Sequence, residues 1–326
     1  LIWGSSFLWI KVGQGEPLPG LPTPAGATAF GPFLLVTFRL LFGLLGMVAV
    51  LAWRRPALPR DRRTLLAFLF MGVFNTALPF VLITWGETLI DSSLASILNA
   101  TVPLFTILLA HFWLRDEKIT ATRLAGLVVG FLGVVILVCR DLAPGGLGGD
   151  LWGQAAVIAA AISYAVALTF ARRNLRNQPP AVQSFMVLLF ADALMWVATP
   201  VAEGPLVLPT SPLAWFAVAW LGLLGSCVAY LLFFHLNNVW GPSRASLVTY
   251  TFPVIGLVLG VLFLGERPDW RLLAGSALVI SGIVVVNLRS LWQSLRPAPP
   301  APGADLGSQA AGAERGATPA PAAPRN

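Results

Sequence analysis

Three charged side chains stand inside apolar stretches of the sequence: Lys11, Arg39 and Asp192. A charge surrounded by hydrocarbon is costly, so it normally faces a polar cavity or a partner. Arg39 lies six residues after the outer start of its apolar run, about 9 Å deep. Asp192 lies about 16 Å from the inner start of its own run, on the opposite side of a hydrocarbon core about 30 Å thick. Their levels then differ by roughly 4 to 5 Å, which a long arginine side chain can bridge.

Two interpretations of this pair stay open. In the first, Arg39 binds a substrate carboxylate through its planar guanidinium, and Asp192 binds a coupling proton or a substrate amine. In the second, the two residues form a structural ion pair, or their charges reach toward the membrane surface.

Prolines and polar side chains recur in the other apolar runs. Pro103 and Pro253 leave backbone groups that neighbouring helices or cavity water must satisfy, and such bends often border a binding site. We expect about half of the polar side chains in these runs to line a cavity and the rest to join helices. These candidates are Asn75, Asn99, Tyr164, Tyr230, Thr249 and Tyr250.

Residue patterns of enzymes and metal sites are absent from the sequence. It has no G-x-S-x-G and no H-E-x-x-H motif. Its two histidines, His111 and His235, are not part of a metal-binding motif. Cys139 and Cys227 lie singly in apolar runs, without C-x-x-C spacing. We therefore expect no catalytic residue, no metal and no cofactor.

The composition indicates a lipid bilayer as the main solvent. The 326 residues are 57% apolar and 11% charged, with a mean hydropathy of +0.79, whereas a soluble domain has roughly 25% charged residues. The net charge of +7 comes from short basic runs between apolar stretches, which argues against a nucleic-acid partner. Abundant arginine, alanine, glycine and proline fit a GC-rich genome and hence a bacterial inner membrane.

Ten apolar runs approach the length of a membrane helix. They cover residues 1–15, 33–53, 65–85, 94–114, 122–139, 152–171, 181–201, 213–235, 245–264 and 271–288. Fourteen Lys or Arg residues flank these runs on one side and four on the other, which predicts that both termini are cytoplasmic. The first run is short, so we expect a truncated N-terminus, and the Pro/Ala/Gly-rich residues 297–326 should be disordered.

An internal repeat relates the two halves of the chain. Residues 95–114 match residues 245–264 at a shift of 150, and the Leu-Ala-Gly triplet at 124–126 recurs at 273–275. Farther upstream, Gly72 matches Gly222. Because each half has five runs, an odd number, the second half must sit inverted in the membrane. Inverted repeats of this kind place a substrate site at their interface near the bilayer midplane.

Several motifs resemble the EamA-type branch of the drug/metabolite transporter superfamily. They are WGSSF at residues 3–7, ASILNATVPLFT with RDEKITATRLAG in the first half, and TFPVIG with LGERPDWRLLAG in the second. The similarity covers about residues 1–290, although the loop at 16–32 looks longer than usual for the family. Trp3 and Ser6, within the first motif, join the candidate substrate-binding residues.

The resemblance implies an all-α integral membrane protein of ten transmembrane helices arranged as two inverted five-helix repeats, residues 1–140 and 151–290. It implies alternating-access transport of small metabolites, with export of amino acids or related amphipathic compounds as the leading expectation. The alternatives are a channel or structural membrane protein, an uptake carrier, and an intramembrane enzyme. We expect a functional monomer whose coupling ion, if it has one, is a proton.

Overall fold

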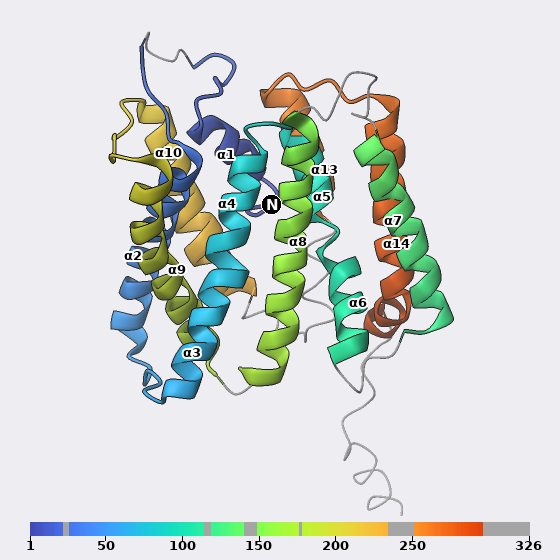
Figure 1. Cartoon of the computed structure of the whole chain (residues 1–326), viewed down its shortest axis with the longest axis horizontal. Coiled ribbons are helices and arrows are strands. Elements are labelled where there is room, and N and C mark those ends of the chain that lie inside the picture. Colours follow the sequence, from blue (N-terminus) through green and yellow to red (C-terminus); the bar gives the residue numbers. More distant parts are fainter. Residues whose placement is uncertain (22–25, 114–118, 140–148, 176–177, 234–250, 296–326) are drawn as a thin grey trace, which may run out of the picture.

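The computed structural model describes residues 1–21, 26–113, 119–139, 149–175, 178–233 and 251–295. Every regular element in these ranges is a helix (Figure 1). Seven helices in the described ranges are long and apolar enough to cross a membrane, and two shorter apolar helices accompany them. The molecule is therefore an all-helical integral membrane protein, as the sequence predicts.

The helices follow the apolar runs closely. In the first half they are α1 Ser6–Gly13, α2 Pro32–Arg54, α3 Arg62–Met71, η1 Gly72–Ala77, α4 Leu78–Gly86, α5 Ser92–Asn99, α6 Val102–Trp113 and α7 Ala121–Cys139. In the second they are α8 Gly149–Asn174, α9 Pro180–Glu203, α10 Pro212–Trp220, η2 Leu221–Val228, α13 Thr251–Phe263 and α14 Trp270–Leu295.

Local capping sets several helix starts. The carboxylate of Asp61 accepts a 2.8 Å hydrogen bond from the Thr64 backbone N–H, which begins α3. This interaction with Thr64 holds the pKa of Asp61 below its usual value. Ser211 accepts from the Ala214 N–H in the same way and begins α10. Helices α2, α9 and α10 have proline in the first turn, where a backbone N–H would have no partner within the helix.

Helices from matching places in the two halves pack against each other in opposite directions. Thr37 of α2 hydrogen-bonds Thr199 of α9 at 2.6 Å, while the α2 start meets Glu203 at the α9 end. Along α7 and α14, a methyl group on Gly126 or Gly133 would lie 2.7 Å from the carbonyl oxygens of Gly282 and Gly275. An inverted repeat requires such antiparallel pairs. The superposition of the complete halves stays a prediction.

Two π-helices occupy matching places in the repeat. The first, η1, begins at Gly72 and interrupts the third membrane span; the second, η2, contains Gly222 and interrupts the eighth predicted span. A π-helix is uncommon and widens the helix, and it frequently occurs at a functional site. Its recurrence at sequence-matched glycines supports the internal duplication.

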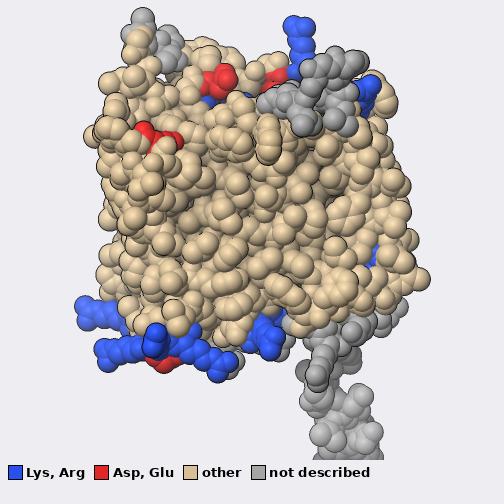
Figure 2. Space-filling view, in the orientation of Figure 1, with Lys and Arg blue, Asp and Glu red and all other residues tan. Residues whose placement is uncertain are grey.

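Charged side chains gather at the two ends of the helices, with an almost uncharged band between them (Figure 2). We call the end with the exposed arginines of α2, α3 and α8 the basic face and the other end the opposite face. The basic face includes Arg54, Arg55, Arg60, Arg62, Arg63, Arg172 and Arg173. The uncharged band is the part that contacts lipid.

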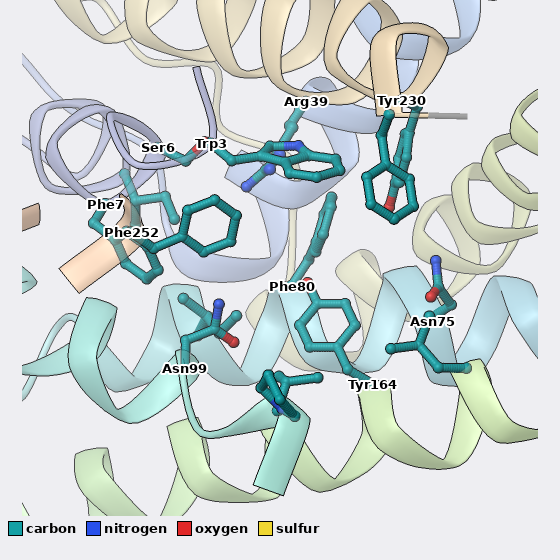
Figure 3. Close-up of a pocket in the computed structure, with 16 residues that line it drawn as sticks. Trp3, Ser6, Phe7, Arg39, Asn75, Phe80, Asn99, Tyr164, Tyr230 and Phe252 are labelled. Carbon is teal, nitrogen blue, oxygen red and sulfur yellow. The ribbon is translucent and has the colours of Figure 1, made fainter. Parts of the chain in front are cut away.

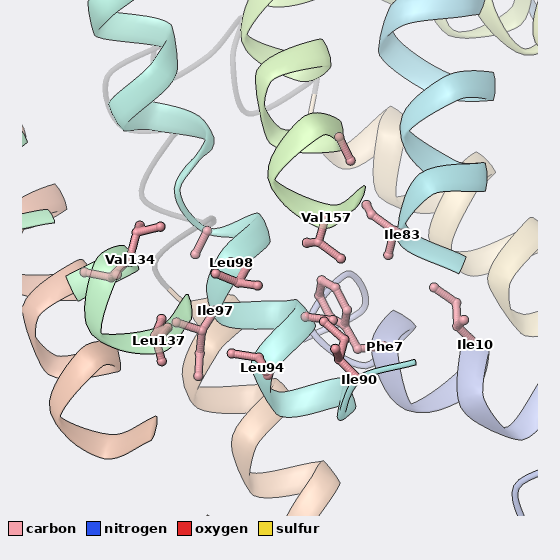
Figure 4. Packing of buried hydrophobic residues seen from close by; sticks show 14 of the residues in the cluster. Phe7, Ile10, Ile83, Ile90, Leu94, Ile97, Leu98, Val134, Leu137 and Val157 are labelled. Carbon is pink, nitrogen blue, oxygen red and sulfur yellow. The ribbon is translucent and has the colours of Figure 1, made fainter. Parts of the chain in front are cut away.

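An apolar plug lies near the opposite face, where α1, α4 and α5 meet (Figure 4). We use this name for Phe7, Ile10, Ile83, Ile90 and Leu94, each of which is at most 5% exposed. All five belong to one buried cluster. The plug is therefore shielded from water at this position between the central cavity and the opposite face.

Candidate functional site

A cavity of about 170 Å³ lies at the centre of the molecule, among helices of both halves (Figure 3). We call it the central cavity. Its walls come from α1, α2, η1, α4, α5, α6, α8 and α13 and from the residues after η2. They consist of Trp3, Ser6, Phe7, Ile10, Arg39, Asn75, Phe80, Ile83, Asn99, Val102, Pro103, Tyr164, Leu168, Tyr230, Phe233 and Phe252.

Arg39 is the one charged residue among the described residues that line this cavity. Its side chain is 4% exposed, its Nε donates to the Ser226 hydroxyl at 3.3 Å, and its Cζ lies 3.9 Å from the Phe80 ring centroid. A guanidinium over an aromatic face is attracted by the negative face of the ring. Both contacts are neutral, so they orient the guanidinium without cancelling its charge.

Close packing of α2 on η2 positions Arg39. A methyl group on Gly43 would lie 2.8 Å from the Ser226 Cβ, and one on Gly222 would lie 2.6 Å from the Arg39 carbonyl oxygen. The two glycines thus let the backbones approach to a distance that side chains would prevent. Ser226 donates in turn to the Leu221 carbonyl at 3.2 Å, so the η2 backbone holds the hydroxyl that accepts from Arg39.

An aromatic wall surrounds Trp3 on one side of the cavity. The Trp3 ring meets Tyr230 and Phe252 edge-on, at centroid distances of 5.8 and 6.0 Å, and Phe233 at 5.3 Å. Its Nε1 donates a 2.8 Å hydrogen bond to the Gly225 carbonyl of η2. This bond satisfies the only polar group of the indole, so the wall presents a mainly apolar surface to the cavity.

Polar groups from η1 face this wall. The Tyr230 side chain hydrogen-bonds with Thr76 and Asn75, both in η1. The Asn75 Nδ2 also donates to the Thr76 hydroxyl at 3.4 Å. Both π-helices therefore serve the cavity: η1 lines it with Asn75, and η2 provides Ser226, which accepts a hydrogen bond from the lining residue Arg39. Tyr164 of α8 completes the polar lining and lies close enough to Arg39 to interact with its charge.

The fourth membrane span is broken at the cavity. Helix α5 ends at Asn99 and α6 begins at Val102, with Pro103 in its first turn. The Oδ1 atom of Asn99 is buried and has no hydrogen-bond partner. Broken helices supply polar backbone and side-chain groups at the substrate sites of transporters. The unpartnered amide oxygen at the break can accept a hydrogen bond from a ligand.

Most of the residues that the sequence singled out meet at the central cavity. Those lining it are Trp3, Ser6, Arg39, Asn75, Asn99, Pro103, Tyr164 and Tyr230. Pro253 lies buried in α13 and outside the lining, although its neighbour Phe252 lines the cavity. Thr249, Tyr250 and His235 lie outside the described residues. Whether the lining residues bind a substrate stays a prediction.

The structure does not contain the ion pair considered between Arg39 and Asp192. Asp192 is 6% exposed on α9 but does not line the cavity, and its side chain hydrogen-bonds with Trp196 one turn away. Its Oδ1 has no hydrogen-bond partner. Helical rise had placed the two residues at similar depths, but it does not determine the direction in which each side chain points.

Two residues that contact the Arg39 side chain escaped the sequence analysis. Phe80 and Ser226 both contact Arg39, yet each looks ordinary in an apolar run. Ser226 follows Gly222 and Gly225, so the cluster of small residues was the available signal for close helix contact. Phe80 carried no signal, because phenylalanine is common in membrane helices.

The cavity suits a small amphipathic anion. Its apolar and aromatic walls can bury a hydrocarbon group, and Arg39 can bind a carboxylate through two parallel hydrogen bonds. Among the described lining residues no acidic side chain competes for Arg39. Nor does the described part of the chain contain a group of three or more metal-ligating residues.

Comparison with known proteins places this geometry in context. The sequence model of the EamA-like transporter family matches the chain twice, at residues 1–139 and 151–288. The uncharacterized transporter YoaV of Bacillus subtilis is 26% identical over 292 residues, which cover 87% of this chain and 92% of YoaV. The uncharacterized inner membrane transporter YedA of Escherichia coli is 25% identical over 294 residues, which cover 88% of this chain and 88% of YedA.

The chain is also similar to a further sequence relative and to a solved structure. A protein of Streptantibioticus cattleyicolor, named a probable terminal-alkyne amino-acid exporter, is 29% identical over 89% of this chain and 91% of its own length. One crystal structure superposes with a TM-score of 0.62 at 22% identity, over 90% of this chain and 94% of the other. At this identity the superposition supports the helical arrangement alone.

Proposed function

Because the chain belongs to the EamA-like transporter family, we propose that it exports amino acids or related amphipathic carboxylates across a bacterial inner membrane by alternating access. The central cavity is the substrate site in this proposal, and Arg39 binds the substrate carboxylate. The arginine-rich basic face is cytoplasmic, in keeping with the positive-inside rule.

The observation that carries the proposal is the uncompensated charge of Arg39. The guanidinium is buried, its contacts are a hydroxyl and an aromatic ring, and it lines a cavity without an acidic residue among its described walls. A buried charge without a counter-charge is costly, and binding of an anion offsets that cost. The amino-acid exporter among the relatives supports the same substrate class.

The other lining residues contact the rest of the substrate. The wall around Trp3 contacts the apolar part of the substrate, and Asn99 at the α5–α6 break accepts from a substrate ammonium or amide. Antiparallel packing of matching helices allows one half to rock against the other, which is how inverted repeats produce alternating access.

The test compares free amino acids with their methyl esters, which lack the negative charge. Purified protein is reconstituted in proteoliposomes and uptake of a labelled panel is measured for the wild type, Arg39→Lys and Arg39→Leu. Asp192→Asn is the matched control, because it removes a buried charge that does not line the cavity. We expect wild-type transport of free acids, but not esters, to saturate with concentration.

Loss of the guanidinium should weaken binding of the free acid by about 2 kcal/mol or more, roughly thirtyfold in affinity. Arg39→Lys keeps the charge but cannot bind a carboxylate in the bidentate manner of a guanidinium, so its transport should also fall. Asp192→Asn should transport normally, and adding Asp192→Leu to Arg39→Leu should not restore transport. Normal transport by Arg39→Leu at matched protein levels would refute the binding role; flux that does not saturate would indicate a channel.

A further inference from the structure

A second buried charge lies between the central cavity and the opposite face. Glu87 caps the C-terminal end of α4 and directly follows the membrane span that ends at Gly86. Its side chain is 0% exposed, and neither carboxylate oxygen has a hydrogen-bond partner. Ile83, which lines the cavity and belongs to the apolar plug, lies one helical turn before it, about 6 Å nearer the centre.

The surroundings of Glu87 contain charges but no contacting partner. The charged groups near enough to interact with it are Lys11 of α1, Glu266 of the α13–α14 turn and Arg39 of α2. The carboxylate of Glu266 is already engaged, because it accepts the backbone N–H groups of Ser92 and Ser93 at 2.7 and 3.0 Å.

Among the side chains that the structure describes, the neighbouring elements α8 and α5 add no titratable group at this point. Around Gly86, α8 contributes Gly153, Ala156 and Val157. The start of α5 contributes the hydroxyls of Ser92 and Ser93, both buried without a partner. Asp91 lies in the same turn and makes an interaction of its own.

A carboxylate cannot stay ionised at low cost in such a place. Taking the charged form out of water without hydrogen bonds or a contacting cation is far more costly than burying the neutral acid. Burial accordingly raises the pKa of Glu87 well above its ordinary value of 4.5; Lys11 opposes this shift, Glu266 adds to it, and Arg39 opposes it. The conformation with the opposite face closed therefore favours the protonated acid.

We propose that Glu87 is a proton-binding residue whose protonation closes the opposite face. On closing, the carboxylate takes one proton from the solution at that face and becomes a neutral acid buried beside the apolar plug. On opening, the acid is hydrated and returns the proton to the same solution. The inference rests on the alternating access proposed above, because it needs a second conformation in which the opposite face is open.

A proton is a better ligand here than a metal ion. A cation site would need several oxygen ligands around the carboxylate, and Lys11 already adds a positive charge nearby. No group of three or more metal-ligating residues occurs in the described part of the chain. The neutral acid also leaves the positive charge of Arg39 available to a substrate, whereas an ionised Glu87 would partly compensate it.

The first experiment needs no substrate. Infrared spectra of the purified full-length protein in liposomes are recorded while the pH is varied, and the carbonyl band of a protonated carboxylic acid is followed. We expect this band near neutral pH in the wild type and a weaker one in Glu87→Gln. Asp192→Asn is the matched control, because Asp192 is the other buried acid described away from the cavity lining.

The second experiment follows opening of the plug. Leu94→Cys, at a position 2% exposed, is introduced after Cys139 and Cys227 are replaced by alanine, and its reaction with an impermeant thiol reagent is timed. Because the thiolate is the reacting form, each rate is divided by the rate of a free thiol at the same pH. The resulting ratio should rise with pH, by at most about tenfold per pH unit for one coupled proton. Glu87→Gln imitates the protonated acid, so its ratio should stay low at every pH.

Three outcomes would overturn the proposal. They are an infrared band that disappears in Asp192→Asn but persists in Glu87→Gln, no protonated-acid band in the wild type at neutral pH, or a labelling rate that responds to sodium instead of pH. The absence of a protonated-acid band is measured on the wild type alone. Misfolding of Glu87→Gln therefore cannot conceal a failure of the proposal. Neither experiment uses a substrate, so carboxylate transport through Arg39 can stand if this inference fails.

Discussion

At the scale of single residues, the molecule buries two charges of opposite sign in different ways. Arg39 keeps a neutral hydroxyl and an aromatic ring as partners and faces the central cavity. Glu87 has no hydrogen-bond partner and lies buried beside the apolar plug. A guanidinium stays charged at every physiological pH, whereas a carboxyl can lose its charge by binding a proton. The first residue therefore suits anion binding and the second suits a response to pH.

The pH dependence of stability should identify Glu87. Because its folded-state pKa is raised above 4.5, the folded protein binds this proton more tightly than the unfolded chain does. The contribution of Glu87 to stability is therefore largest below about pH 4.5 and falls as the pH rises toward the folded pKa. Glu87→Gln should remove this decline and raise the melting temperature on the alkaline side. The melting temperature of detergent-solubilised protein is measured across the pH range.

The control for this measurement is Glu203→Gln, an acid that is hydrogen-bonded to the Phe33 and Leu34 backbone N–H groups. It should be less stable than the wild type, because a charged acceptor is lost. If the melting temperature of Glu87→Gln runs parallel to that of the wild type across the pH range, Glu87 stays ionised in the folded protein.

At the scale of helices, close backbone packing fixes the elements that surround the site. Helices α7 and α14 pack on glycines along one side of the molecule, away from the cavity walls (Figure 1). The Gly126-x-x-x-Gly130 spacing is typical of a close helix contact, and both glycines do contact Gly282. Between membrane helices such contacts replace the hydrophobic driving force that acts in water.

Gly126→Ala should therefore destabilise the protein without changing substrate affinity. Its methyl group would lie 2.7 Å from the Gly282 carbonyl oxygen, so α7 and α14 must separate, at a cost of about 1 to 3 kcal/mol. The control Val128→Ala changes a residue of the same helix that is 53% exposed. Melting temperature and binding of the transported acid are both measured. Equal stability of the two variants would show that the helices separate freely.

At the scale of the whole molecule, charge defines the orientation. The exposed arginines of α2, α3 and α8 form the basic face, and acidic side chains appear at the other end (Figure 2). Glu203 and Glu266 cap the starts of α2 and α5, which lie away from the basic face. Membrane insertion places the side richer in Lys and Arg in the cytoplasm. The basic face should therefore be cytoplasmic and the apolar plug should lie toward the outside.

Two cysteine variants of equal exposure test this orientation. Leu58 and Leu206 are each 44% exposed, Leu58 beside the basic face and Leu206 between α9 and α10 at the opposite face. With the native cysteines replaced, an impermeant thiol reagent should label Leu206→Cys in intact cells. Leu58→Cys should be labelled only after the membrane is permeabilised. The reverse pattern would contradict the orientation and, with it, the assignment of Glu87 to the outer side.

The sequence by itself determined the membrane environment and the positions of the helices, and it singled out Arg39 as a charge within a membrane span. These depend on local properties: a membrane helix needs about 20 apolar residues whatever its neighbours are, and a charge within such a run is conspicuous. The matching glycines at 72 and 222 also indicated the repeat, though not the π-helices that form around them. Family motifs predicted a transporter, which the double match to the family model confirmed.

Only the tertiary structure decided which way each side chain points. In a helix that is apolar on all sides, residue spacing gives depth but not the face that packs inward. Asp192 therefore had the right depth to meet Arg39 but does not line the cavity, while Ser226 and Phe80 came to contact Arg39 through the packing of α2 on η2 and α4. Glu87 looked like an ordinary charge at a helix end, and packing by other helices buried it. Burial depends on neighbours distant in sequence, which local pattern does not specify.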